Sequence, residues 1–493
     1  MIDRVWRFLA KFFLLSPGPT GPVAASPSRP ALSAGVWATL GEAVRGSRQD
    51  FTAVPIRRAV VLLAVPMVLE MSMESLFAIV DIFWVSKLGA EAVATIGLTE
   101  AMLSVVYAVA MGLSAGATAT VARRIGEKDR EGAALAAVQA ICAGVVISAA
   151  IGATGIWSAP QLLSAMGASP AVVSQGAGYT AVMLGGSVTV VLLFLVNAIF
   201  RGAGDAAAAM RSLWLANIIN IVLDPFFIFG WGPFPEMGVA GAAVATTIGR
   251  GIGVLYQLAN LARSGTALSI GRRHLRFDVS VTVRLLRISA FGILQTLVES
   301  ASWLGLVRIL SGFGSAALAG YTIAIRVAIF ALLPSFGFAN AAATLVGQNL
   351  GAGRPERAER SVWIAAFYNF VFLGSVSVVF VLLPGPIVHF FTVDPAVVPF
   401  AVDCLRIVAL GFLFYAYGFV FAQAFNGAGD TTTPTLLNFF CFWLFKIPAA
   451  YLLAMTAGMG PRGVFIAVTA AYSTLAVAGG FLFRRGGWKG RRV

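Results

Sequence analysis

The residues of this chain that could do chemistry are a few polar side chains inside long apolar runs. Asn217, Asn220 and Asp224 are spaced three and four residues apart, so on a helix they form one polar face. Pro225 follows directly and removes a backbone donor. A carboxyl group buried in such a pocket can take up and release a proton near neutral pH. The spacing therefore predicts a proton site at Asp224, and the alternative is a structural cluster of hydrogen bonds between helices.

Further acids lie within other apolar runs. Asp81 is only a few residues from the end of its run, so its position fits either a function inside the membrane or simple contact with water. Pro66, fifteen residues earlier, can bend the same helix by breaking its hydrogen-bond ladder, and we expect it to act as a hinge. Glu74 and Glu299 lie in the middle of their runs. They are candidates to face each other across a substrate cavity and attract cations, or to be paired structural acids.

These polar side chains are exceptional because the chain is very apolar. Its 493 residues are 59% hydrophobic and only 11% charged, whereas a soluble domain has about 25% charged residues. Apolar runs recur along almost the whole chain after residue 58. Each run is long enough to cross a bilayer as a helix, which needs about 20 residues. The composition excludes a soluble fold and predicts an all-α integral membrane protein.

The apolar runs predict twelve transmembrane helices, at residues 59–85, 92–120, 133–157, 172–200, 211–231, 237–263, 285–311, 315–346, 361–383, 395–425, 435–456 and 462–483. An even number of spans places both termini on one side. The loops on that side carry 22 Lys and Arg residues, whereas the opposite loops carry only Lys87 and Arg462. The net charge of +14 therefore indicates the membrane topology and does not indicate a nucleic-acid-binding surface. We expect a multi-pass protein of the plasma (inner) membrane with both termini in the cytoplasm.

An internal repeat divides the chain into two similar units. An offset of 225 residues places the segment 200–205 on 425–430, with the sequences Phe-Arg-Gly-Ala-Gly-Asp and Phe-Asn-Gly-Ala-Gly-Asp. The same offset places Glu74 on Glu299 and Pro-Ala-Val-Val at 170–173 on the same letters at 395–398. Because each unit has six spans, the sequence predicts two six-helix bundles in a parallel repeat, an arrangement that suits alternating access.

The predicted organisation has five parts. These are a cytoplasmic, partly amphipathic tail at 1–55, an N-terminal six-helix lobe at 56–264, a basic cytoplasmic linker at 265–284, a C-terminal six-helix lobe at 285–484 and a basic cytoplasmic tail at 485–493.

An enzyme would need clustered nucleophiles or metal ligands. The two histidines, His274 and His389, lie on opposite sides of the predicted membrane, and the sequence has no Walker A loop. The three cysteines share no short spacing. We therefore expect a transporter without catalytic residues, metal site or bound cofactor, driven by an ion gradient.

Several motifs resemble those of the multidrug and toxic compound extrusion (MATE) family, over roughly residues 55–485. The matching segments are Val80–Gly89, the Arg-Gly-Ala-Gly-Asp loop, Asn220–Asp224, Gly238–Thr246 and Val346–Gly353. The resemblance implies efflux of small amphiphilic, often cationic organic compounds in exchange for protons or sodium ions. We expect a monomer whose partners are these substrates and membrane lipid, without nucleic acid.

The resemblance also implies roles for individual residues. Proton-coupled prokaryotic members place one carboxylate in helix 1 and an Asn, an Asp and a Thr in helices 5 and 6, which match Asp81, Asn220, Asp224 and Thr246. The sodium-coupled NorM branch has a Glu in helix 7, matched by Glu299, and an Asp in helix 10, where this chain has Tyr415. A sodium ion needs several oxygen ligands, and this chain lacks the second carboxylate, so we expect proton coupling, as in the DinF-like branch. Tyr415 is instead a candidate residue of the substrate cavity.

Two other functions remain open from the sequence. A flippase for a lipid-linked saccharide would have a similar two-lobed body but should show a large basic cavity for pyrophosphate. The predicted spans hold seven acids and five bases, which disfavours an anion carrier only mildly. A sodium-coupled drug antiporter is the second alternative.

Overall fold

The structure is a computed structural model that describes residues 32–47, 49–263 and 267–491. Within these ranges the chain is helical and contains no strand. Eleven helices are long and apolar enough to cross a membrane, and α14 (Val398–Leu410) and α15 (Phe412–Gly427), bent by 56°, form a further span together. The predicted all-α fold with twelve spans is confirmed. The amphipathic stretch predicted near the start of the 1–55 tail lies outside the described residues.

The N-terminal lobe contains the first six spans. Its helices, after the short α2 (Leu32–Arg45), are α3 (Ile56–Ser86), α4 (Ala90–Gly126), α5 (Arg130–Ala165), α6 (Pro170–Gly185), α7 (Ser187–Gly202), α8 (Ala206–Phe229) and α9 (Val239–Ala262). The helices α6 and α7 are interrupted at Gly186 and together form the fourth span. Asp129, Ser169 and Asp205 cap the starts of α5, α6 and α8 by accepting hydrogen bonds from backbone N–H groups.

The C-terminal lobe repeats this order with more interruptions. Its helices are α10 (Val279–Ser311), α11 (Ser315–Gly351), α12 (Pro355–Leu382), the short α13 (Pro384–His389), α14, α15, α16 (Thr432–Asn438), α17 (Ile447–Tyr451) and α18 (Pro461–Arg485). Two π-helical stretches, Phe439–Lys446 and Leu452–Thr456, complete the span that contains α16 and α17. Helix α10 begins within the predicted linker 265–284, because the Asp278 side chain caps it.

The two lobes contact each other through a pair of crossed helices from each. Helix α4 packs along α10, and α11 packs along α3. Gly112 allows the first close approach, against Ile293, and Gly337 allows the second, against Val68. The two contacts are equivalent under the 225-residue offset, so the repeat in the sequence is also a repeat in the interface.

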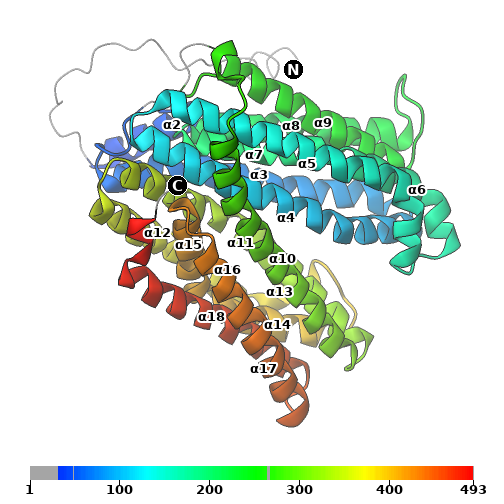
Figure 1. Ribbon diagram of the computed structural model, residues 1–493. Coiled ribbons are helices and arrows are strands. Elements are labelled where there is room, and N and C mark those ends of the chain that lie inside the picture. Colours follow the sequence, from blue (N-terminus) through cyan, green and yellow to red (C-terminus); the bar gives the residue numbers. More distant parts are fainter. Residues whose placement is uncertain (1–31, 48, 264–266, 492–493) are drawn as a thin grey trace.

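The lobes lie together at one end of the bundle and diverge toward the other (Figure 1). At the closed end, defined by the last turns of α4 and α11, a methyl group added to Gly126 would overlap the Gln348 carbonyl. A methyl group added to Gly351 would overlap the Arg123 carbonyl in the same way. Close backbone contact therefore closes this end, which the predicted topology places in the cytoplasm.

Segments outside the spans also connect the lobes at the closed end. Before α3, the Asp50 carboxylate binds Lys128 of the N-terminal lobe at 2.6 Å. Two residues later, the Thr52 carbonyl accepts a hydrogen bond from Arg354 of the C-terminal lobe at 2.7 Å. After α18, the Arg491 carbonyl accepts a hydrogen bond from Arg123 at 2.5 Å. Both flanks of the described chain thus stabilise the closed arrangement.

We expect Gly351→Val to weaken the contact between the lobes, because the new side chain would overlap backbone that cannot rotate away. The free energy of unfolding should fall by about 1–3 kcal/mol, the usual cost of overpacking. Thermal unfolding of the purified protein in detergent measures this change. Gly385→Val is the matched control, since a Cβ at Gly385 meets no atom within 4 Å. Equal stability of the two variants would contradict the role of this contact.

Candidate functional site

Three of the predicted coupling residues lie together where α8 packs against α9. The Asn220 side-chain amide donates a hydrogen bond to Thr246 Oγ1 at 2.8 Å. Asp224 lies one turn further along α8 and its exposed fraction is 0%. Neither carboxyl oxygen of Asp224 has a hydrogen-bond partner among the described residues, and nor does the Asn220 side-chain oxygen. The site therefore contains an acid and an acceptor that the protein itself leaves unsatisfied.

Asp81 lies on α3, which packs against α8, and its side chain is partly exposed. Its charge interacts with that of Glu100 on α4, with that of Arg250 on α9 and with that of Asp224. The position of Asp81 in the sequence left two possibilities open, contact with water and a function inside the membrane. Both remain, because the side chain is partly exposed and its charge interacts with that of Asp224.

Arg250 links this site to Glu74. One terminal nitrogen of Arg250 donates a hydrogen bond to the Tyr107 hydroxyl at 3.0 Å and lies 4.0 Å from a Glu74 carboxylate oxygen. The other Glu74 oxygen accepts a hydrogen bond from Asn217 at 3.0 Å. Asn217 therefore serves Glu74 and not Asp224, although the two residues share a helix face in the sequence pattern.

A cavity of about 400 Å³ lies between the lobes. Its apolar lining includes Met71, Met111, Phe194, Leu333 and Phe336, and its polar lining includes Glu74, Arg201, Gln295, Thr296, Glu299, Asn340 and Asn426. Glu74 and Glu299 thus reach the same cavity from different lobes. Of the other predicted site residues, Asp81, Asn220, Asp224, Thr246 and Tyr415 are not among the described residues that line it.

The C-terminal lobe surrounds its glutamate differently. Glu299 accepts a hydrogen bond from the Tyr472 hydroxyl at 3.0 Å. Lys446, in the first π-helical stretch, has an exposed fraction of 0% and donates a hydrogen bond to Ser302 at 2.7 Å. The Lys446 charge also acts on Glu299. Tyr415 is buried behind Tyr472, with ring centroids 4.5 Å apart, so the structure places it in the core of this lobe.

The proposed hinge, Pro66, is buried inside α3. Helix α3 nevertheless continues without interruption from Ile56 to Ser86. The proline removes one backbone donor from the ladder of this helix, which leaves a weak point next to the Val68 contact with α11. Its role as a hinge remains a prediction.

Glu70, for which no role was predicted, lies at the centre of a buried network. One Glu70 carboxylate oxygen is 2.6 Å from the Arg201 guanidinium and accepts a hydrogen bond from Asn197 at 2.9 Å. The Asn197 side-chain oxygen accepts a hydrogen bond from Gln257 at 2.6 Å. The network joins α3, α7 and α9, and Arg201 extends from it to the wall of the central cavity.

A signal for this network is present in the internal repeat. The 225-residue offset places Glu70 on Gln295 and Arg201 on Asn426. An acid and a base in the first lobe are thus both replaced by neutral amides in the second. A matched replacement of this kind indicates that the two positions are neighbours in space.

We expect Glu70→Gln to destabilise the protein, because it leaves the Arg201 charge buried without its partner. Breaking a buried ion pair from one side costs about 3–5 kcal/mol of unfolding free energy. The double variant E70Q/R201N removes both buried charges, as the amides Gln295 and Asn426 do at the equivalent positions, and should recover most of this loss. Thermal unfolding of the unmodified protein, E70Q, R201N and the double variant tests the coupling, and a double variant as unstable as the sum of the two single changes would contradict it.

Comparison with known proteins agrees with the fold and the repeat. The family model MatE matches residues 66–226 and 292–452, one stretch in each lobe. A protein of Thermotoga maritima named probable multidrug resistance protein NorM is 29% identical over 446 residues, which cover 89% of this chain and 94% of that protein. The FAD transporter of Shewanella oneidensis is 25% identical over 445 residues, which cover 89% and 96% of the two chains.

Solved structures show the same architecture. A structure described as the outward-facing conformation of a multidrug resistance MATE family transporter superposes with a TM-score of 0.84 and 27% sequence identity. The match covers 90% of this chain and 98% of that one. The family match in both lobes, the relatives of nearly full length and this shared structure lead to one assignment: the chain belongs to the MATE family of membrane transporters and is not an enzyme.

Proposed function

We propose that this protein is a secondary active antiporter that exports small amphiphilic, cationic organic compounds in exchange for protons. The observation that carries the proposal is the Asp224 carboxyl group, which is fully buried and has no hydrogen-bond partner among the described residues. A charged carboxylate at membrane depth costs at least about 2.5 kcal/mol when it is unpaired. Binding a proton removes that charge, so Asp224 is a suitable carrier for the coupling ion.

The charges between Asp224 and the cavity provide a route for coupling. Arg250 interacts with Asp81 on one side and with Glu74 on the other. When Asp81 takes up a proton, Arg250 loses the negative charge on that side. The attraction of Arg250 is then directed toward Glu74, and Glu74 holds a cationic substrate less strongly. Proton uptake and substrate release are thereby linked in the direction that an antiporter requires.

Alternating access follows from the way the lobes meet. They are closed at the Gly126 and Gly351 contact and diverge at the opposite end (Figure 1). With the positive-inside rule placing both termini in the cytoplasm, this state opens outward. The inward-open state would separate the glycine contacts, with Pro66 as the hinge of α3. We propose that the protein performs this cycle as a monomer in the plasma (inner) membrane.

The C-terminal lobe supports protons over sodium ions. Lys446 is buried, and its positive charge acts on Glu299. A sodium ion bound to Glu299 would be repelled by this ammonium group and would lack the second carboxylate, because Tyr415 occupies that position. This arrangement favours the proton-coupled branch of the family.

The cavity lining supports cationic substrates. Glu74 and Glu299 face it from both lobes, and its basic lining residue, Arg201, is paired with Glu70. A flippase for a lipid-linked saccharide would need unpaired cations to hold pyrophosphate. FAD, for which the Shewanella oneidensis relative is named, also carries phosphate groups, so we do not expect it to be a substrate here.

Uptake of a fluorescent cationic dye into inverted membrane vesicles tests the coupling. With an imposed pH gradient, the unmodified protein should accumulate dye whether or not sodium is present. Asp224→Asn and Asp81→Asn should reduce uptake to the level of vesicles without the transporter, since the amide binds no proton. Asp403→Asn is the control, because Asp403 on α14 pairs with Arg462 on α18, both in the other lobe. Intact uptake in both site variants, or uptake driven by sodium alone, would overturn the proposal.

Replacing Glu299 by Gln tests substrate charge separately. The KM for a monocationic dye should rise about tenfold, equivalent to about 1.4 kcal/mol, because the cavity loses one carboxylate. The KM for a neutral dye of similar shape should stay the same. Transport kinetics in the same vesicles give both values, with Glu356→Gln, an exposed position outside the cavity, as the control. Equal effects on both dyes would show that Glu299 acts on shape rather than on charge.

A further inference from the structure

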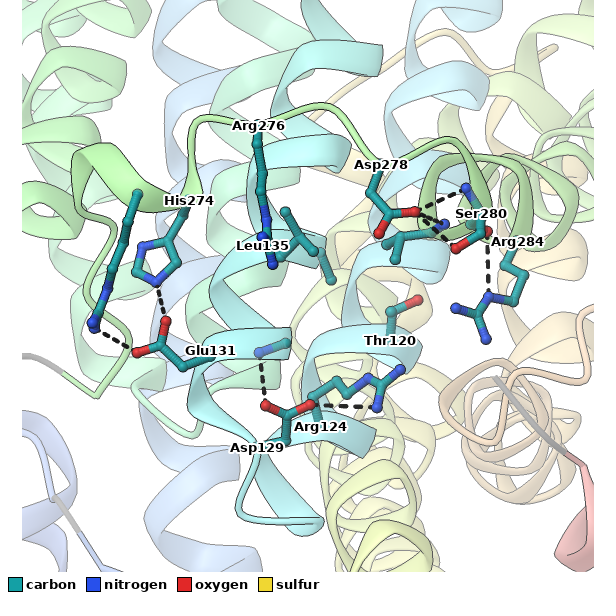
Figure 2. Close-up of a pocket in the computed structure, with 14 residues that line it drawn as sticks. Thr120, Arg124, Asp129, Glu131, Leu135, His274, Arg276, Asp278, Ser280 and Arg284 are labelled. Atoms are coloured by element: carbon teal, nitrogen blue, oxygen red, sulfur yellow. Dashed lines mark hydrogen bonds and ion pairs between the residues drawn. The ribbon is translucent and has the colours of Figure 1, made fainter.

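A second cavity, of about 520 Å³, lies outside the predicted transport path. It is formed at the closed end by α4, α5, the start of α10 and the linker between the lobes (Figure 2). The polar side chains that line it are Thr120, Arg124, Asp129, Glu131, Arg273, His274, Arg276, Asp278, Ser280 and Arg284. Both lobes therefore contribute to it.

The acids of this cavity are all engaged in structural contacts. Asp129 accepts a hydrogen bond from the Gly132 N–H at 2.8 Å and pairs with Arg124 at 3.4 Å. Glu131 binds Arg273 at 2.5 Å and His274 at 2.6 Å.

Asp278 is engaged in the same way, as the cap of α10. It accepts hydrogen bonds from the side chain and N–H of Ser280 and from the Val281 N–H. The hydrogen bonds from the Ser280 side chain and the Val281 N–H lower the pKa of Asp278, so it stays ionised in its capping position. The charge of Arg276 also acts on Asp278, but none of the three acids forms an ion pair within 4.0 Å with either of the remaining arginines of the lining.

Arg276 and Arg284 are those remaining arginines. Within the described parts of the chain, neither forms an ion pair within 4.0 Å. Both guanidinium groups point into the cavity on either side of Thr120 (Figure 2). Among the described residues, Arg284 donates only to the Ser280 carbonyl one turn earlier, at 3.3 Å. Guanidinium groups bind phosphate oxygens through paired hydrogen bonds, so the cavity fits a phosphate-bearing anion.

The same segment presents an apolar edge beside this basic cavity. From residue 275 to residue 280 the side chains alternate strictly between apolar and polar. Arg276, Asp278 and Ser280 line the cavity, whereas Leu275 and Phe277 are 68% and 71% exposed. An apolar edge next to cationic side chains at a membrane surface is the pattern of contact with anionic lipid.

We propose that this cavity binds the phosphate-bearing headgroup of an anionic phospholipid. Arg276 and Arg284 contact the phosphate, and the acyl chains lie beside Leu275 and Phe277. Because Arg276 lies in the linker and Arg284 on α10, next to α4 and α5 of the other lobe, the bound lipid stabilises the closed end. The proposal does not depend on which ion or substrate the protein transports.

Thermal unfolding of the delipidated protein in detergent tests the site. Phosphatidylglycerol should raise the Tm, and phosphatidylcholine at the same concentration should not. R276Q/R284Q should lose most of the rise. R272Q/R287Q should keep it, because these two arginines are exposed and lie outside the cavity, so the control removes the same amount of charge. An equal rise in R276Q/R284Q and the unmodified protein would overturn the proposal.

Two further measurements use the unmodified protein, so a folding defect in the variant cannot affect them. The first distinguishes a lipid phosphate from a soluble phosphate. Soluble glycerol phosphate at millimolar concentration should leave the Tm unchanged, and a rise equal to that with phosphatidylglycerol would show that the site takes a soluble anion instead. Native mass spectrometry of the unmodified protein, released from mixed micelles, should retain phosphatidylglycerol in preference to phosphatidylcholine. Equal retention of the two lipids would also overturn the proposal.

Discussion

Charges inside a bilayer are costly unless they are paired, and the interior of both lobes is arranged around this constraint. Glu70 meets Arg201 at 2.6 Å, and Asn197 adds a hydrogen bond to the same carboxylate. Lys446 is held by Ser302 and lies 4.3 Å from the Phe442 ring centroid. Against this background Asp224 is distinctive, because it is as deeply buried as Glu70 but has no such partner among the described residues.

The contact between the lobes explains how such an interior can also move. Backbone meets backbone at Gly126 and Gly351, so the closed end has a defined geometry that requires no long side chain to reorder. The polar contacts around it come from segments beside the spans, such as the Asp50 pair with Lys128 and the Arg491 pair with Asp430 at 3.2 Å. The Asp50 pair with Lys128 is accessible to water on both sides and therefore weak, so it can break during a transport cycle, whereas Asp430 in the other pair is buried.

Much of the fold could be predicted because membrane helices and duplications leave strong signals in a sequence. The interruptions within helices were less predictable, since the breaks at Gly186 and Gly411 depend on packing and both glycines have ordinary backbone angles. The site was predicted in part. Residues on one helix, such as Asn220 and Asp224, follow from spacing. Thr246 was predicted only through the family resemblance, and its contact with Asn220 was not predicted.

Contacts between distant helices were the main feature that spacing could not supply. Glu70 and Arg201 are 131 positions apart, and nothing local in either segment identifies the partner. Tyr415 illustrates the opposite case, because its aligned position suggested a cavity residue while the packing of Tyr472 covers it. In both cases the contacts of the residue depend on which helix faces pack together, and the sequence does not show this.

The equivalence of the Gly112 and Gly337 contacts has a consequence for the origin of this architecture. Each lobe offers the other the same surface, as in the isologous interface of a symmetric dimer. A single six-helix unit could form such an interface with its own copy, and both copies would then carry identical residues. Joining the units in one chain removes that requirement. One copy can then keep Asp224 while the other has Ala449 at the equivalent position, so gene fusion permits a division of labour that a homodimer cannot have.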